Sequence, residues 1–183
     1  MSSQIRFDTI QKVRQIWAVQ PVFLDTETTG LSDSAEIVEI SIIDYDGSVL
    51  LDSLVRPRRP IPADAMRVHG ISNEMVKGAP TWMHVWPKVE AILAGRQAGI
   101  YNADFDLRMM QQSHRQIGLP WRRLTAQPFC VMRLYADFYG ARKWQRLEDA
   151  GLQSGISLPN SHRAKDDALL TLALFKYMVD SQS

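Results

Sequence analysis

Two acidic residues two positions apart, at the end of a short apolar segment, could together bind a metal ion. They are Asp25 and Glu27, in the segment FLDTETTG. If residues 22–26 form a strand, this spacing places both side chains on one face. Two carboxylates in one small volume repel each other, and a hard divalent cation between them turns the repulsion into binding. The pair therefore predicts a metal site, although acids are also common on solvated loops at strand ends.

A third candidate acid lies near the start of a helix expected over residues 103–117. Asp104 and Asp106 both fall in its first turn, where the helix dipole favours negative charge. On the helix surface Asp104 lines up with polar residues, whereas Asp106 lines up with Met109 and Met110. Asp106 is therefore expected to point inward, where a carboxylate requires a cation from elsewhere in the fold.

The last expected helix, residues 164–179, has polar residues at its beginning. Residues five apart on a continuous helix lie about 140° apart. His162 and Asp167 can therefore share a site only if His162 lies on the preceding loop. Periodicity does not distinguish Asp167 from its neighbour Asp166. Beyond its first turn the helix is apolar on nearly all sides, so we expect it to be buried with its polar end facing a cleft.

The remaining elements indicate how these residues are positioned. Strands expected over residues 36–44 and 48–56 flank an Asp46-Gly47 turn, which gives three mostly antiparallel strands. Helices and a short strand, at 98–101, alternate after the proline-rich connector at residues 56–62. The further helices are expected at residues 63–68, 72–76, 81–93 with a kink or break at Pro87, 131–138 and 147–152. This order predicts a three-layer α/β domain around a mixed sheet.

The composition is that of an ordinary globular domain, with 45% hydrophobic and 22% charged residues among 183. A single cysteine, Cys130, excludes an intramolecular disulfide. The net charge of +1 neither requires nor excludes a nucleic-acid partner. No segment has the apolar length of a signal peptide or membrane span, so we expect a cytoplasmic protein. Residues 1–20 are expected to form an accessory amphipathic helix on the domain at residues 21–183.

Four segments together resemble a known family. FLDTETTG, VHGIS, YNADFD and HRAKDD, in this order, are similar to the motifs of the DEDDh (DnaQ-like) 3′-5′ exonucleases, which include proofreading subunits of bacterial replicative polymerases and exonuclease X. The similarity covers about residues 22–179. It implies a ribonuclease H-like fold with a central mixed five-stranded sheet flanked by helices. Tyr101 and Cys130 depart from the pattern, since many members have histidine and aspartate there.

The resemblance also implies roles for individual residues. The reaction would be hydrolysis of the 3′-terminal phosphodiester of DNA, with single-stranded or frayed ends favoured, to release nucleoside 5′-monophosphates. A two-metal mechanism with Mg²⁺ or Mn²⁺ would use His162 as the general base. The metal ligands would be Asp25, Glu27, Asp106 and Asp167, and the terminal nucleotide would contact Thr28, Gly30, Leu31, His69 and Phe105.

The implied partners are a nucleic acid with a free 3′ end, DNA before RNA, and a polymerase or other replication or repair protein. An RNA-trimming exoribonuclease and a non-catalytic polymerase-associated module are alternatives within this fold. An aspartyl-phosphate phosphatase would explain the Asp25-x-Glu27 pattern but none of the other motifs. Trp144, between Lys143 and Arg146, is the best candidate among the tryptophans for stacking on a base.

Overall fold

The computed structural model describes residues 2–121, 125–141, 143–156 and 162–182. Its centre is a five-stranded mixed sheet with the order β3-β2-β1-β4-β5. The first three strands pair antiparallel, and β4 and β5 extend the sheet in parallel with β1. The strands are β1 (Val22–Thr28), β2 (Ile37–Ile43), β3 (Val49–Leu54), β4 (Gln97–Ile100) and β5 (Gln127–Cys130). The predicted mixed five-stranded sheet is confirmed.

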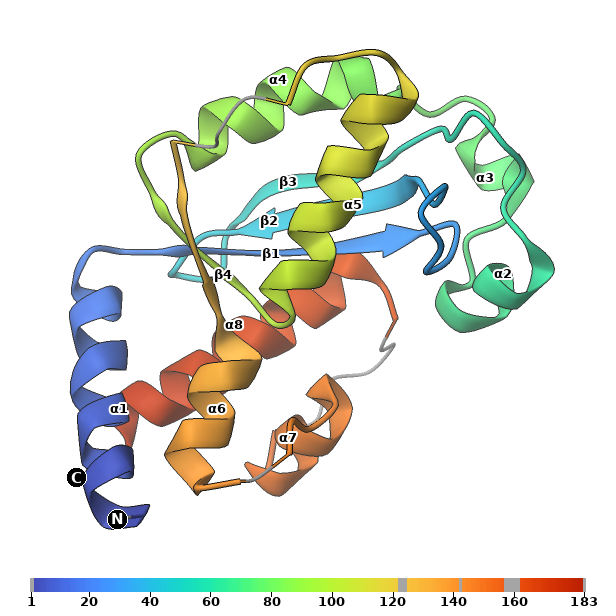
Figure 1. Ribbon diagram of the computed structural model, residues 1–183. Helices are drawn as coiled ribbons and strands as arrows, with labels where there is room; N and C mark the ends of the chain where they lie inside the picture. Colours follow the sequence, from blue (N-terminus) through green and yellow to red (C-terminus); the bar gives the residue numbers. More distant parts are fainter. Residues whose placement is uncertain (1, 122–124, 142, 157–161, 183) are drawn as a thin grey trace.

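Helices cover both faces of this sheet (Figure 1). One layer contains α4 (Trp82–Leu93) and α5 (Ala103–Gln116), and the other contains α1 (Ser2–Ala18), α6 (Val131–Tyr139) and α8 (Ala164–Asp180). The shorter helices are α2 (Ala63–His69), α3 (Asn73–Val76) and α7 (Leu147–Gln153), of which α7 packs against α8. The three-layer α/β architecture agrees with the order of elements expected from the sequence.

Strand β1 separates the two hydrophobic cores by simple alternation. Leu24 belongs to the core shared with α4 and α5, whereas Phe23 belongs to the core shared with α1, α6 and α8. Because successive side chains in a strand point to opposite faces, Asp25 and Glu27 share the α8 face with Phe23. Thr26 shares the α5 face with Leu24. The apolar residues of β1 thus determine which helix each polar residue meets.

Helix α4 differs in part from its sequence-based expectation. A kink or break was expected at Pro87, and the helix is continuous from Trp82 to Leu93, so the break is absent. Proline removes one backbone donor from the helix interior. Burial of Val85, Trp86 and Val89 against the sheet layer holds the helix together around this missing hydrogen bond.

The local sequence did not predict strand β5. It contains Pro128, which normally argues against a strand because proline cannot donate to the sheet ladder. In the structure β5 is the last strand of the sheet. The backbone groups on the outer side of such an edge strand do not pair with another strand, so a missing N–H can be tolerated there. Gly99 of β4 lies between it and β1, and a Cβ atom there would come within 2.6 Å of the Phe23 ring and 2.8 Å of Phe129. Only glycine therefore permits this packing beside β1.

The N-terminal helix lies where the sequence predicted it. Ile10 and Val13 are fully buried against α6 and α8, and Trp17 packs against Phe175 of α8. Within the described residues, no helix combines the length and the apolar character needed to cross a membrane.

Candidate active site

Three carboxylates from two elements meet at the end of β1. Asp25 and Glu27 come from the strand, and Asp167 comes from the first turn of α8. One oxygen from each lies within 4.8 Å of the other two. The strand alternation described above directs the first two acids toward α8, and this is why they meet the third. Of the two aspartates that periodicity could not distinguish, Asp167 belongs to this acidic cluster, whereas Asp166 lines a neighbouring cavity.

Asp106 is held next to the cluster by Thr26, the residue between Asp25 and Glu27 on β1. It is 3% exposed in the first turn of α5, so the predicted inward orientation is confirmed. Its Oδ1 accepts a hydrogen bond of 2.7 Å from the Thr26 hydroxyl. Among the nearby acids, Asp106 raises the pKa of Asp25 the most. The four predicted acids are thus close neighbours, with three in one cluster and the fourth anchored by Thr26.

Burial and repulsion from other nearby acids raise the pKa of every acid in this group. Burial is the largest cause throughout, and it raises the pKa of Glu27 to about 8, of Asp106 to about 7 and of Asp167 to about 6. The pKa of Asp25 lies well above its ordinary value because burial and the charges of its acidic neighbours act together. Closely spaced carboxylate oxygens with unfavourable charge fit a hard divalent cation, which would stabilise their ionised forms.

The stability of the metal-free protein should fall as the pH rises through this range. Each of these acids has a higher pKa in the folded state than in the unfolded state, so its protonation stabilises the fold. This stabilisation is full below about pH 4 and is lost as the pH rises through roughly 6 to 8. We expect the Tm in EDTA to decrease from pH 5 to pH 9, and Mg²⁺ or Mn²⁺ to reverse most of that decrease. Thermal unfolding across this pH series, with and without metal, measures both. A metal-free Tm that rises toward pH 9 would contradict the expectation.

His162 lies on the loop before α8, as the spacing to Asp167 requires. Its φ of +67° is a left-handed conformation that non-glycine residues rarely adopt. The His162 backbone N–H donates to Asp167 Oδ1 at 3.4 Å. The imidazole Nε2 lies 3.2 Å from Glu148 Oε1 on α7. Strained backbone of this kind persists where the surroundings impose it, often at functional sites.

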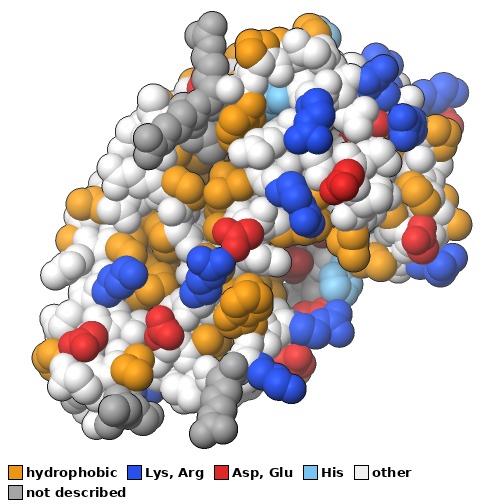
Figure 2. Space-filling model, in the orientation of Figure 1, with side chains coloured by type: hydrophobic (Ala, Val, Ile, Leu, Met, Phe, Trp, Pro, Cys, Tyr) orange, Lys and Arg blue, Asp and Glu red, His pale blue; other side chains and the backbone are white. Residues whose placement is uncertain are grey.

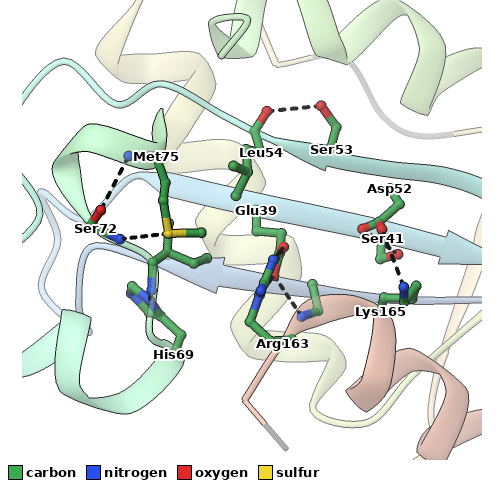
Figure 3. Close-up of polar contacts among 12 residues, drawn as sticks. Glu39, Ser41, Asp52, Ser53, Leu54, His69, Ser72, Met75, Arg163 and Lys165 are labelled. Carbon is green, nitrogen blue, oxygen red and sulfur yellow. Dashed lines mark hydrogen bonds and ion pairs between the residues drawn. The ribbon is translucent and has the colours of Figure 1, made fainter. Parts of the chain in front are cut away.

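A buried acid on β2 fixes the start of α8, and sequence reasoning overlooked it. The Glu39 side chain is 3% exposed and accepts bonds from Arg163 Nε at 3.2 and 3.1 Å, one to each oxygen. Arg163 Nη2 also contacts Glu39 Oε1, and the Ala164 N–H donates to Oε2 at 2.9 Å (Figure 3). Because Glu39 faces Glu27 across the β1-β2 pair, it holds α8 where Asp167 reaches β1. The sequence did contain a sign of this buried acid, because Glu39 lies inside the otherwise apolar segment EIVEISII.

Removing Arg163 should therefore destabilise the fold strongly. The Arg163→Ala variant leaves Glu39, 3% exposed, without its cation. Breaking a fully buried pair costs about 3–5 kcal/mol, and because Arg163 itself is 39% exposed we expect a loss below that range but well above that of a surface pair. Lys165→Ala is the matched control, because Lys165 pairs with Asp52 at 3.9 Å with both side chains over a third exposed. Such surface pairs contribute about 0–1 kcal/mol. Urea unfolding of both variants makes the comparison, and equal losses would show that the Glu39 pair has no special role.

A cavity of about 540 Å³ opens beside the acidic cluster. All five residues predicted to contact a nucleotide line it: Thr28, Gly30, Leu31, His69 and Phe105. Helix α2 adds Asp64, Ala65 and Val68, which sequence reasoning missed although Val68 begins the VHGIS motif and the other two lie just before it. Figure 2 shows this face of the molecule hollowed, with acidic, basic and histidine side chains at the edge of the hollow. Gly30 has φ +141°, which a side chain would strain.

His69 lines this cavity with a buried imidazole. It is 4% exposed, and its Nδ1 accepts the Ile71 N–H at 3.0 Å. Burial lowers the pKa of His69, which favours the neutral ring, so the proton resides on Nε2. Nε2 is buried and forms no hydrogen bond of standard geometry within the described parts of the chain, although the Thr28 backbone lies close enough to raise the pKa of the ring. A buried donor of this kind is costly unless a ligand satisfies it.

Comparisons with known proteins identify the family of this chain. The RNase_T family model, described as an exonuclease, matches residues 22–175. The chain is 42% identical over 164 residues to the uncharacterized exonuclease CP81 of Escherichia phage 186, covering 84% of each chain. It is 26% identical to the DNA polymerase III subunit epsilon of Treponema pallidum (strain Nichols), covering 85% of this chain and 74% of that one.

Among solved structures, exonuclease X in complex with 5′ overhanging duplex DNA is similar to this fold. The TM-score is 0.69 at 29% sequence identity, and the match covers 87% of this chain and 92% of that chain. The family match spans both β1 and α8, the two elements that supply the acidic cluster. The chain therefore belongs to the DEDDh (DnaQ-like) family of 3′-5′ exonucleases.

Proposed function

We propose that this protein removes nucleotides from the 3′ end of DNA, with single-stranded or frayed ends favoured, and releases nucleoside 5′-monophosphates. The observation that carries the proposal is the cluster of Asp25, Glu27 and Asp167, which lies beside a cavity lined by all five predicted nucleotide-contacting residues. DNA is favoured because exonuclease X, 29% identical, was solved with duplex DNA, and the epsilon relative is a DNA polymerase subunit.

Divalent metal ions would be held by the four acids. Asp25, Glu27 and Asp167 would form the main oxygen cage, and Asp106, anchored by Thr26, would complete it toward α5. Two Mg²⁺ or Mn²⁺ ions bound there would supply Lewis acidity to the scissile phosphate and the attacking water. The raised pKa values support this assignment, because cations would offset the repulsion that raises them.

His162 would take the proton of the attacking water. Its Nε2 lies 3.2 Å from Glu148, so an Nε2–H donating to that carboxylate leaves the Nδ1 lone pair free to accept a proton. The cavity would hold the terminal nucleotide, with Leu31 and Phe105 offering apolar surface and the His69 Nε2–H donating to a polar atom of the substrate. These side chains belong to rigid elements or to loops anchored on them, which favours orientation of the terminal bond.

A polymerase or another replication or repair protein is the proposed protein partner, by similarity to the epsilon subunit. Residues 1–20 would then be an accessory element on the exonuclease domain at residues 21–183. Helix α1 supports this role, because Ile5 and Phe7 remain 46% and 45% exposed while its other face packs on α6 and α8.

Digestion of labelled oligonucleotides tests the proposed function. DNA and RNA oligomers, labelled at the 3′ or the 5′ end and supplied as single or double strands, are incubated with Mg²⁺ or with EDTA. We expect Mg²⁺-dependent release of mononucleotides from the 3′ end, faster for DNA. Faster trimming of RNA would make the protein an exoribonuclease. Tight binding without cleavage in Mg²⁺ would overturn the enzymatic assignment.

A further inference from the structure

Trp144 leaves its indole in solvent. All five tryptophans lie in described parts of the chain, and Trp144 is the only exposed one, at 65%. Trp82 and Trp86 are buried in the core beside α5, and Trp121 packs against Trp86 and His114. An exposed indole loses the hydrophobic free energy that the other four gain. This single exposed ring therefore suggests a partner with a flat apolar face.

Contacts connect Trp144 to the helix that carries Asp106. The Arg133 guanidinium carbon lies 6.0 Å from the centre of the Trp144 ring, within cation-π range. Arg133 also forms an ion pair with Asp104 in the first turn of α5, two residues before Asp106. Phe105, between them in the sequence, lines the proposed nucleotide cavity. The start of α5 thus links the cavity to the exposed indole.

The segment that carries Trp144 is anchored to the core and to the loop before α8. The buried Tyr101 hydroxyl donates to the Gln145 carbonyl at 2.8 Å. Helix α7 begins three residues after Trp144, and its Glu148 contacts the His162 imidazole. The backbone next to the indole is therefore tied to the core at Tyr101, and the helix that follows it contacts the proposed base.

The surroundings of the ring are rich in basic groups. Lys143 and Arg146 flank Trp144 in the sequence, and both are exposed. Arg133 adds a third cation against the ring itself, and Arg108 lies 5.5 Å from the Phe105 ring nearer the cavity. Two nearby acids are engaged, since Asp104 pairs with Arg133 and Glu148 with His162. An aromatic face among cations is the arrangement that binds single-stranded nucleic acid.

We propose that Trp144, Arg133, Lys143 and Arg146 form a single-strand platform, on which a base upstream of the terminal nucleotide stacks against the Trp144 indole. The platform rests on the proposed function, because it holds the same strand whose 3′ end occupies the cavity. Stacking on an indole tolerates any base, so the platform would contribute affinity without sequence preference. Its substrate class is a single-stranded 3′ tail several nucleotides long.

Substrate length provides the test. The p-nitrophenyl ester of thymidine 5′-monophosphate reports on the cavity alone, whereas DNA oligomers of increasing length also reach the platform. We expect Trp144→Ala to leave kcat/KM for the ester within about twofold of wild type. With longer oligomers the variant should lose roughly tenfold in kcat/KM, mainly through a higher KM, because one base-aromatic contact is removed. Trp144→Phe should restore most of this loss.

Met83→Ala is the matched control, because Met83 is 49% exposed on α4 in the opposite helical layer. It should follow the wild-type length dependence. Parallel length curves for Trp144→Ala and wild type would overturn the platform and leave the indole as a surface for a protein partner. A wild-type enzyme that hydrolyses neither the ester nor any oligomer would overturn the proposed function itself, and the platform with it.

Discussion

Replacing Asp25 with asparagine should reduce turnover by at least about a thousandfold and leave the fold intact. Asp25 supplies one of the three carboxylates that lie within 4.8 Å of one another, and its neighbours are all acidic. The stabilisation that metal ions give a transition state is worth several kcal/mol, and each 1.36 kcal/mol corresponds to tenfold in rate. Single-turnover digestion of a labelled oligomer in saturating Mg²⁺ measures the loss.

The same variant should be more stable than wild type without metal. Burial and the neighbouring acids raise the pKa of Asp25, so its ionised form is unfavourable in the folded state. Asparagine resembles the protonated acid, and the Tm in EDTA near pH 9 should therefore rise by a few degrees, since about 1 kcal/mol shifts Tm by roughly 2–4 °C at this size. The shift in Tm on adding Mg²⁺ should shrink, because a ligand stabilises only the state that binds it.

A pair of adjacent aspartates provides the control for this prediction. Asp167→Asn should behave like Asp25→Asn, since Asp167 belongs to the same cluster. Asp166→Asn removes the same charge one residue earlier on α8, outside the cluster, and should retain most activity. Full activity of Asp25→Asn in excess Mg²⁺ would exclude Asp25 as a metal ligand. Equal losses in the Asp166 and Asp167 variants would indicate a general effect of charge at the start of α8.

The elements that carry the site could be predicted because their patterns are local. Alternation in β1 places Asp25 and Glu27 on one face, and the periodicity of α5 turns Asp106 inward. The apolar character of α8 predicted a buried helix with a polar first turn, and eight of its residues are indeed buried. In each case a short window of sequence contains the hydrophobic pattern that fixes the orientation.

What could not be predicted depends on contacts between distant segments. Nothing local to Glu39 indicates that its partner is Arg163, which lies 124 residues away. Thr26 donates a hydrogen bond to Asp106 across 80 residues, and that contact holds the fourth acid beside β1. Strand β5 exists because its neighbour β4 offers an edge, although Pro128 argues locally against a strand. Long-range pairing of this kind has no signature within one segment of the chain.

In the proposed mechanism His162 is the general base, and His162→Ala should therefore lose about 10²–10⁴ in rate, the usual contribution of a positioned general base. The imidazole extends from a left-handed backbone position and contacts Glu148, so its ring is oriented from two sides. Alanine cannot accept the proton of the attacking water. The measurement is again single-turnover cleavage in saturating Mg²⁺, where substrate binding and product release do not limit the rate.

The rise in Tm on adding Mg²⁺ distinguishes the loss of rate in His162→Ala from the loss caused by removing a metal ligand. His162 is not among the three acids of the cluster, so His162→Ala should keep the Mg²⁺-induced rise in Tm that Asp25→Asn loses. Added imidazole should recover part of the rate, because a free base can occupy the space that the side chain leaves. A single-turnover rate equal to wild type would assign His162 a structural role, in which its backbone N–H supports Asp167 and the imidazole is dispensable. Proton transfer would then have to proceed without a side-chain base at this position.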